Sequence, residues 1–201
     1  VELCAKYDTL LVVDDSHATG VLGATGRGSA EETGVHGKVA VYTSTLGKAM
    51  GSAAGGFTTG PAPLVDLLRQ RSRTTLFSNA LPPAVAASSL EAFRMLIEDP
   101  APVQRLRANA AYFRKRMTDA GFTIPEGVHP IVPVIVGDTA KALAMSAALF
   151  DKGVYVSGFG FPVVPQGHAR LRCQISATHS TADLDEAVAA FVAVGREFGV
   201  I

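Results

Sequence analysis

Side chains that could do chemistry together stand in the first quarter of the sequence: Asp14, His17 and Lys48. Lys48 lies among small residues in T-S-T-L-G-K-A-M-G, and a lysine ammonium is costly to bury without a partner. An amine crowded by apolar surface loses part of its proton affinity and becomes a nucleophile that can form a Schiff base. A carboxylate and an imidazole three residues apart could serve the same ligand as hydrogen-bond partner and proton carrier.

Other interpretations of Lys48 exist. A phosphate-binding loop needs glycine five residues before the Gly-Lys pair and Ser or Thr after it, but Tyr42 and Ala49 occupy those positions. A surface lysine with an extended stem remains open at the level of the motif. A hydrolase that pairs Ser16 or Ser44 with the imidazole lacks the G-x-S-x-G turn that exposes such a nucleophile.

The flanking elements predict how the side chains meet. Leu10 to Asp14 is typical of a strand buried on both faces of a parallel sheet, and Val39 to Thr43 of a second strand. Open α/β sheets bind ligands at the carboxyl ends of their strands, so Asp14 and the loop carrying Lys48 are expected at one site. Asp15 should point to the other side of the sheet.

This set of groups suits pyridoxal phosphate. A carboxylate against the pyridine nitrogen keeps it protonated, so that the ring can accept electrons from a substrate carbanion. Asp14 is the better placed acid, and Lys48 would carry the aldehyde and then act as a base. His17 could hydrogen-bond the phenolic oxygen or carry a proton to the substrate carbonyl.

Taken as a whole, the chain is predicted to contain the C-terminal portion of a large parallel-sheet domain over residues 1–99 and a small α/β domain over residues 100–201. The boundary is the acid- and proline-rich segment 98–102. The further elements expected are strands at 53–58, 131–136, 154–157 and 169–176, and helices opening at 61–63, 82–83, 103, 139 and 181. Ser180 with Asp183 predicts a capping box for the last helix.

Composition limits the partners. The chain has 201 residues, 48% of them hydrophobic, and Lys plus Arg (18) equals Asp plus Glu (18), so no global field recruits nucleic acid or an anionic membrane. Cys4 and Cys173 lack metal-type spacing, which favours a reducing cytoplasm and no metal site. The start, V-E-L-C-A-K-Y-D, is typical of a helix already under way, and we expect a C-terminal part of a longer protein.

Several motifs together resemble a known family. D-D-S-H-A-T-G-x-x-G-x-x-G-R-G, T-S-T-L-G-K, L-F-S-N-A-L-P-P and G-H-A-R-L-R-C-Q-I-S-A-T-H occur in the order and spacing of the α-oxoamine synthases. These are fold-type I pyridoxal phosphate enzymes similar to class II aminotransferases. The resemblance covers the whole chain, and it implies that Lys48 binds the cofactor aldehyde, Asp14 the pyridine nitrogen, His17 the phenolic oxygen and Thr45 the phosphate.

The resemblance assigns further residues. Ser78 and Asn79 match a segment that reaches the cofactor phosphate of a neighbouring subunit, which implies a homodimer with shared sites. Arg172 matches the arginine that binds the substrate carboxylate. From the strand pattern alone, Arg170 and Arg172 would be interpreted as the solvent-exposed face of an edge strand. Gly20, Gly23, Gly26 and Gly28, which could cradle a phosphate, are instead given a structural role as positions of positive φ.

The implied reaction condenses glycine with acetyl-CoA to 2-amino-3-oxobutyrate and CoA, as in threonine breakdown. A sister activity joins alanine to a pimeloyl thioester. A third hypothesis is a non-catalytic dimerisation piece, because the family's N-terminal half contributes further cofactor contacts. We therefore expect the 201-residue chain alone to bind the cofactor weakly and to turn over little.

Overall fold

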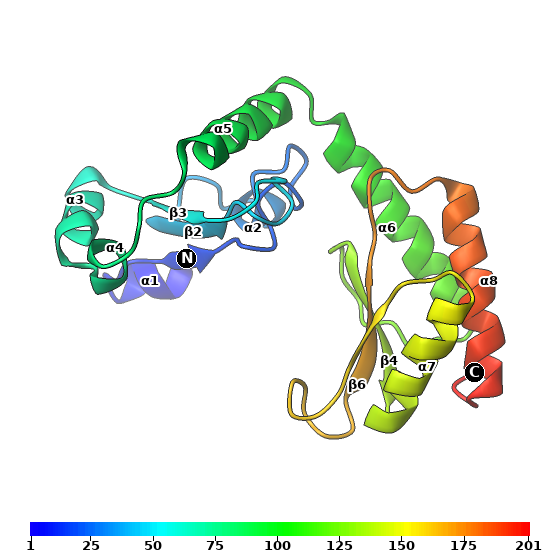
Figure 1. Cartoon of the computed structure of the whole chain (residues 1–201). Coiled ribbons are helices and arrows are strands. Elements are labelled where there is room, and N and C mark those ends of the chain that lie inside the picture. The colour runs from blue at the N-terminus through cyan, green and yellow to red at the C-terminus, as the bar shows by residue number, and fades with distance from the viewer. The chain divides into compact units, whose positions relative to one another are not determined.

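The computed structural model describes residues 1–201, and the chain divides into two compact units, Val1–Gln104 and Arg105–Ile201 (Figure 1). The division falls within α6 (Ala101–Asp119). The domain boundary predicted between residues 99 and 100 lies at the turn that precedes this helix, and it stays a prediction. No helix combines the length and the apolar character that a bilayer crossing needs.

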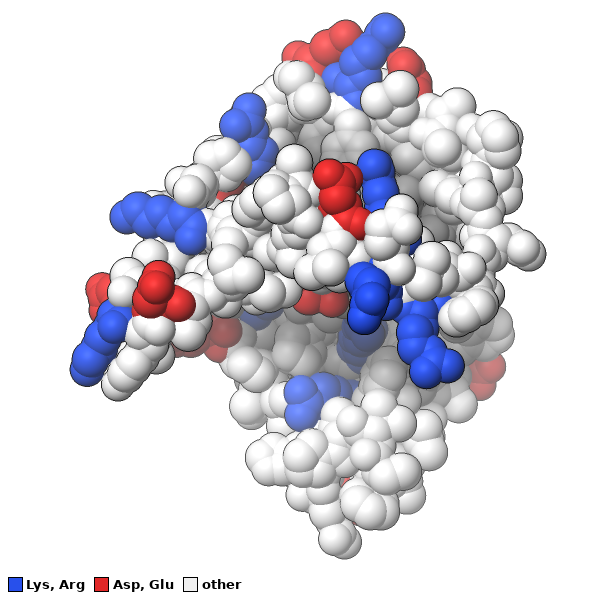
Figure 2. Space-filling view, turned by 90° about the vertical axis from the view of Figure 1, so that its left-hand side faces the viewer, with Lys and Arg blue, Asp and Glu red and all other residues white.

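The first unit is built on a three-stranded sheet in the order β1-β2-β3. β1 (Val12–Asp14) and β2 (Val41–Thr45) are parallel, and β3 (Gly56–Thr59) is antiparallel to β2. The helices of this unit are α1 (Glu2–Lys6), α2 (Ser29–Glu32), α3 (Ala62–Arg71), α4 (Arg73–Leu76) and α5 (Pro83–Glu98). Figure 2 shows a face on which acidic and basic groups are interspersed among more numerous uncharged residues.

Some predictions for this unit are wrong. β1 is not buried on both faces: it is an edge strand paired with β2 alone, and Val12 is 59% exposed. The third strand begins at Gly56 and runs antiparallel, because the loop after β2 folds back on itself. In that loop the Leu46 amide donates to the Gly55 carbonyl (2.9 Å) and the Ser52 amide to the Leu46 carbonyl (3.0 Å).

The second unit has a separate antiparallel sheet in the order β4-β6-β5. Its elements are α6, β4 (Ile131–Gly137), α7 (Thr139–Asp151), β5 (Ser157–Phe159), β6 (Ala169–Gln174) and α8 (Thr181–Glu197). Fully buried side chains come from the helices and the sheet, among them Phe113, Met145, Leu171 and Phe191. The phenyl ring of Phe191 meets those of Phe113 and Phe122 edge to face, at centroid distances of 6.2 and 5.9 Å.

Two of the three local predictions considered for this unit agree with the structure in type and position, and one strand is displaced along the chain. The strand predicted at 169–176 alternates as expected, with Leu171 and Cys173 buried and Arg172 half-buried, but it ends at Gln174, two residues early. The capping box of Ser180 and Asp183 is confirmed. The strand predicted to begin at residue 154 begins at Ser157, three residues later. Val154 belongs instead to the turn that ends α7, because its amide donates to the Leu149 carbonyl (2.9 Å).

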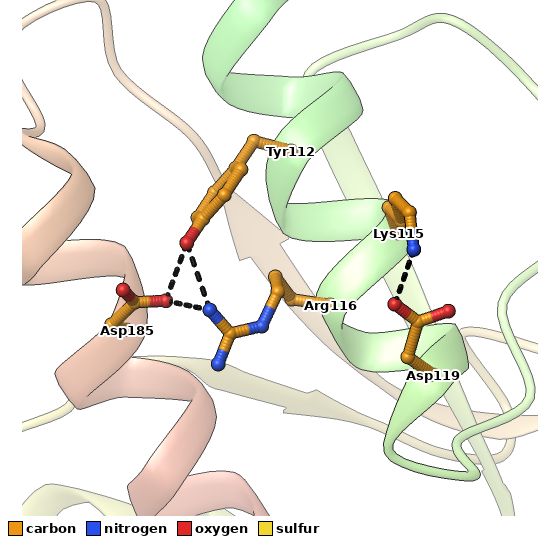
Figure 3. Close-up of polar contacts among 5 residues, drawn as sticks. All are labelled: Tyr112, Lys115, Arg116, Asp119 and Asp185. Atoms are coloured by element: carbon orange, nitrogen blue, oxygen red, sulfur yellow. Dashed lines mark hydrogen bonds and ion pairs between the residues drawn. The ribbon is translucent and has the colours of Figure 1, made fainter.

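A polar cluster ties α6 to α8 (Figure 3). The Tyr112 hydroxyl donates to Asp185 Oδ1 (2.7 Å), and Arg116 donates to both the Tyr112 oxygen (2.8 Å) and the Asp185 carboxylate. Lys115 pairs with Asp119 one turn along the same helix, at 2.5 Å. The cluster is partly exposed and joins two helices, so we assign it a structural role.

Candidate active site

Polar side chains meet where β1 and β2 end. Asp14 is the last residue of β1 and Thr45 the last of β2, and because the strands are parallel their carboxyl ends lie at one edge. The Thr45 hydroxyl donates to the Ser16 carbonyl just after β1 (3.1 Å). Lys48 Nζ donates to Thr45 Oγ1 (3.0 Å). Thr45 therefore connects the lysine to the segment that carries Asp14.

Asp14 is an exposed carboxylate with a lowered pKa. Hydrogen bonds from the Ser16 hydroxyl and then from its backbone N–H lower this pKa most, desolvation opposes them, and the Thr43 hydroxyl and the charge of Lys48 add to the lowering. The Ser16 amide lies 2.8 Å from Asp14 Oδ1. The acid is thus ionised at neutral pH and within the electrostatic reach of the lysine.

The surroundings of Lys48 differ from the prediction. Apolar crowding of the amine was expected, but Lys48 is exposed. The reason is that its small neighbours, Gly47 and Ala49, are themselves exposed and cover nothing, while Leu46 and Met50 turn inward to anchor the loop. The amine is oriented by Thr45 rather than enclosed by apolar groups.

The remaining predicted residues lie in different places. His17 is exposed in the turn directly after Asp14, on the segment that Thr45 holds. Ser78 and Asn79 are exposed between α4 and α5, where the Ser78 hydroxyl makes a long contact with the Asn79 carbonyl (3.4 Å). Arg172 belongs to the second unit, and its guanidinium stacks over the Phe159 ring at 5.8 Å.

The glycine-rich loop is closed by the carboxylates of α2. Gly20, Gly23, Gly26 and Gly28 all have positive φ, as predicted. The Gly23 amide donates to Glu32 (2.8 Å), and the Thr25 and Arg27 amides donate to Glu31. Burial tends to raise the pKa of Glu31, but these hydrogen bonds outweigh it and the pKa is lowered. Amides occupied by protein carboxylates are not a phosphate cradle, which supports the structural role.

Sequence reasoning missed the role of two buried residues behind the site. Asp15 is 3% exposed and accepts hydrogen bonds from the Ser29 hydroxyl (2.5 Å) and from the Ser29 amide (3.2 Å). Ser44 is 5% exposed, donates to the Asp15 carbonyl (3.1 Å) and shares a 2.7 Å hydrogen bond with Thr19. Ser44 is therefore engaged in structure, which argues against a serine hydrolase. Only strand alternation, which turns Asp15 away from Asp14, hinted at this arrangement.

The first unit also contains a cavity of about 370 Å³ that neither Lys48 nor Asp14 lines. The cavity is lined by side chains on the sheet face opposite to Asp14 and by side chains of α5. They include Asp15, Tyr42, Ser44, Phe57, Phe93 and Leu96. The Tyr42 hydroxyl is buried without a hydrogen-bond partner. Burial and then the charge of Asp15 raise the pKa of this phenol, so it remains neutral.

Comparison with known proteins shows what the chain is similar to. Residues 1–191 match the family model described as aminotransferase class I and II. A mouse protein named 2-amino-3-ketobutyrate coenzyme A ligase, mitochondrial, is 52% identical over 199 residues, which cover 99% of this chain and 48% of that protein. A Symbiobacterium thermophilum protein named 8-amino-7-oxononanoate synthase is 46% identical, covering 100% of this chain and 51% of that protein.

Solved structures agree with these relatives. A structure described as SPT with a PLP internal aldimine superposes with a TM-score of 0.93 at 32% identity, over 100% of this chain and 50% of that chain. The predicted fold class, α/β in the manner of fold-type I enzymes, is confirmed. The chain spans about half the length of the curated relatives it matches.

Proposed function

This chain belongs to the aminotransferase class I and II family, and from that membership we propose that it is part of a pyridoxal-phosphate-dependent glycine C-acetyltransferase. The reaction joins glycine to acetyl-CoA, releases CoA and gives 2-amino-3-oxobutyrate, a reaction of threonine breakdown. The mouse relative, whose name is a synonym of this activity, supports the substrate choice. The observation that carries the proposal is that Asp14, Thr45 and Lys48 lie together at the edge where the parallel strands β1 and β2 end.

The residues present fit the cofactor. Lys48 offers an exposed primary amine for the aldehyde, and Asp14, whose pKa is lowered, offers a permanent anion for a protonated ring nitrogen. Thr45 would contact the phosphate, for which its hydroxyl must give up its bond to the Ser16 carbonyl. Bound pyridoxal phosphate supplies an electron sink for the carbon next to the substrate's amino group.

The chain's own side chains then move and hold protons. Lys48 Nζ takes a proton from the α-carbon of glycine, and Thr45 Oγ1, 3.0 Å away, orients that nitrogen. Asp14 accepts a hydrogen bond from the ring nitrogen and keeps its proton in place. His17 donates a hydrogen bond to the oxygen that gains charge when the acetyl thioester is attacked.

Residues outside this edge complete the proposal. Arg172 would hold the glycine carboxylate in a two-pronged clamp, for which the planar guanidinium is suited. Ser78 and Asn79 would reach the cofactor phosphate of a second subunit in a homodimer. Their segment adjoins Phe77, which is 82% exposed and would gain from burial at such a contact.

We also propose a reducing compartment, the cytoplasm, although the mouse relative is named as mitochondrial. Cys4 and Cys173 are free thiols. Burial raises the pKa of Cys173 to about 12, so this thiol is protonated and not nucleophilic at neutral pH.

The runner-up activity is the condensation of alanine with a pimeloyl thioester, which the name of the Symbiobacterium relative supports. A non-catalytic dimerisation piece is the third candidate, since the chain spans about half of its relatives' length. Both alternatives predict a different outcome in a substrate assay.

The test measures CoA release by the chain with excess pyridoxal phosphate, with Lys48→Ala as the control. We expect glycine with acetyl-CoA to give a low rate that exceeds both the alanine and pimeloyl-CoA pair and the control. Loss of the proton-transfer group should cost roughly 10²–10⁴-fold. The opposite substrate preference would support the runner-up, and no rate above the control would contradict the proposed activity for the 201-residue chain and favour the non-catalytic piece.

A further inference from the structure

Two consecutive acids at the end of β1 have opposite surroundings. Asp14 is exposed at the edge where Lys48 lies, whereas Asp15 is 3% exposed on the other side of the sheet. The proposed chemistry uses only the first of them. A buried carboxylate is costly unless it is hydrogen-bonded, so the second acid needs a physical explanation.

All the polar groups of Asp15 are engaged. Its amide donates to the Thr43 carbonyl of β2 (2.8 Å), and its carbonyl accepts from the Ala18 and Thr19 amides (2.8 and 2.9 Å) and from the Ser44 hydroxyl. Its carboxylate accepts from the hydroxyl and the amide of Ser29, the first residue of α2. One residue therefore joins both strands, the following turn and α2.

The fit around the carboxylate is tight. A Cβ added to Gly28 would lie 2.1 Å from Asp15 Oδ2, so the backbone of the glycine-rich loop passes against the acid. Gly28 has φ 94° and ψ −164°, a conformation that is essentially confined to glycine. The loop adopts this backbone geometry at the point where it reaches the Asp15–Ser29 pair.

The pair lies one residue from groups that the proposed reaction uses. The Ser16 amide, adjacent to Asp15, donates to Asp14 Oδ1, and the Ser16 carbonyl accepts from Thr45. If Asp15 moved, the Ser16 peptide groups would move with it, and Asp14 and His17 flank this dipeptide. Hydrogen bonds that hold Asp15 in place therefore also hold Asp14 in place.

We propose that Asp15, held by Ser29, is a positioning residue that sets the orientation of the Asp14 carboxylate and of the His17 turn. The reaction it serves is the one under Proposed function, and this inference rests on that function. The positioning itself is a property of the chain without cofactor, where it can be measured.

The experiment is an NMR titration of the Asp14 carboxyl, with carbon-13 label, in the cofactor-free 201-residue chain. In the parent protein the pKa of Asp14 lies below its ordinary value. In Asp15→Asn and in Ser29→Ala we expect it to rise toward the ordinary value, because the Ser16 donors lose their fixed place. Exchange of the Ser16 amide with solvent should quicken about tenfold, as loss of one good hydrogen bond predicts.

Two further variants separate positioning from general loosening. Ser29→Thr keeps the hydroxyl donor, so the Asp14 pKa and the exchange rate of the Ser16 amide should stay at their values in the parent protein. Thr33→Val removes the hydrogen bond of the Thr33 hydroxyl to the Ser29 carbonyl in α2 without touching the acid, and should change neither. If Asp15→Asn does not fold, Ser29→Ala decides the question.

An unchanged Asp14 pKa in folded Ser29→Ala would overturn the proposal. Because no cofactor or substrate is present, this outcome is separate from a failed substrate assay. A shifted Asp14 pKa together with no glycine-dependent CoA release would keep the positioning and remove the proposed function.

Discussion

The two units of this chain differ in the kinds of side chain that are buried inside each of them. In the second unit the fully buried side chains are large and apolar, and they join three helices to an antiparallel sheet. In the first unit apolar residues such as Leu46 and Met50 are buried together with four polar ones, Asp15, Ser44, Ser52 and Ser89. The unit that carries the candidate site therefore adds buried hydrogen-bonded groups to its apolar packing, which the second unit does not.

This difference has a consequence for function. Apolar packing tolerates small displacements at a modest energetic cost, whereas a buried carboxylate must keep its donors in place. A site that orients an amine and an acid at one sheet edge benefits from the second kind of constraint. The same constraint makes the first unit sensitive to changes that add a single atom.

The largest effect is expected in the apolar core. Phe191→Ala removes a ring that is 1% exposed and touches two other rings, and should lower the free energy of unfolding by about 3–5 kcal/mol. Phe150→Ala is the matched control, since Phe150 is 63% exposed and should cost at most about 0.5 kcal/mol. Hydrogen exchange read separately for each unit in urea would measure both, and equal costs for the two variants would contradict the contrast.

The next effect tests the backbone of the first unit. Gly28→Ala places a Cβ 2.1 Å from a carboxylate oxygen that Ser29 holds in place, at φ 94°, so overpacking adds to backbone strain and we expect a loss of about 3 kcal/mol. Gly34→Ala has φ 70° but no atom within 4 Å of the added Cβ, and should cost only about 1–2 kcal/mol. Chemical denaturation compares the two, and a Gly34 variant as unstable as the Gly28 variant would show that the contact with Asp15 is unimportant.

The smallest effect compares two tyrosines. The Tyr42 hydroxyl is buried without a partner, so Tyr42→Phe should raise the free energy of unfolding by about 1 kcal/mol. The Tyr112 hydroxyl bonds Asp185 and Arg116, so Tyr112→Phe should lower it by a similar ~1 kcal/mol. Opposite signs in thermal unfolding support the account, and a destabilising Tyr42→Phe would reveal a partner for that hydroxyl.

The features that could be predicted from the sequence are those that depend on neighbouring residues or on where parallel strands end. The gathering of Asp14, Thr45 and the Lys48 loop follows from the ends of parallel strands, and the capping box of Ser180 follows from spacing alone. The turn chemistry of the glycine-rich loop was predicted for the same reason, because positive φ is a local demand.

What depends on distant contacts could not be predicted. The exposure of Lys48 follows from where its loop folds, not from the size of its neighbours, and the partner of Asp15 is Ser29, 14 positions away. The direction of β3 was set by backbone hydrogen bonds within the loop from Leu46 to Gly55, which no residue pattern marks.

The most direct test of the central claim is the identity of the amine that meets the cofactor. The chain is treated with excess pyridoxal phosphate and then borohydride, and the reduced adduct is located by peptide mass spectrometry. We predict that Lys48 is labelled and that Lys6, Lys38, Lys115, Lys141 and Lys152 are not, because only Lys48 has Thr45 and Asp14 beside it. Labelling spread evenly over the lysines, or absent from Lys48, would contradict the account.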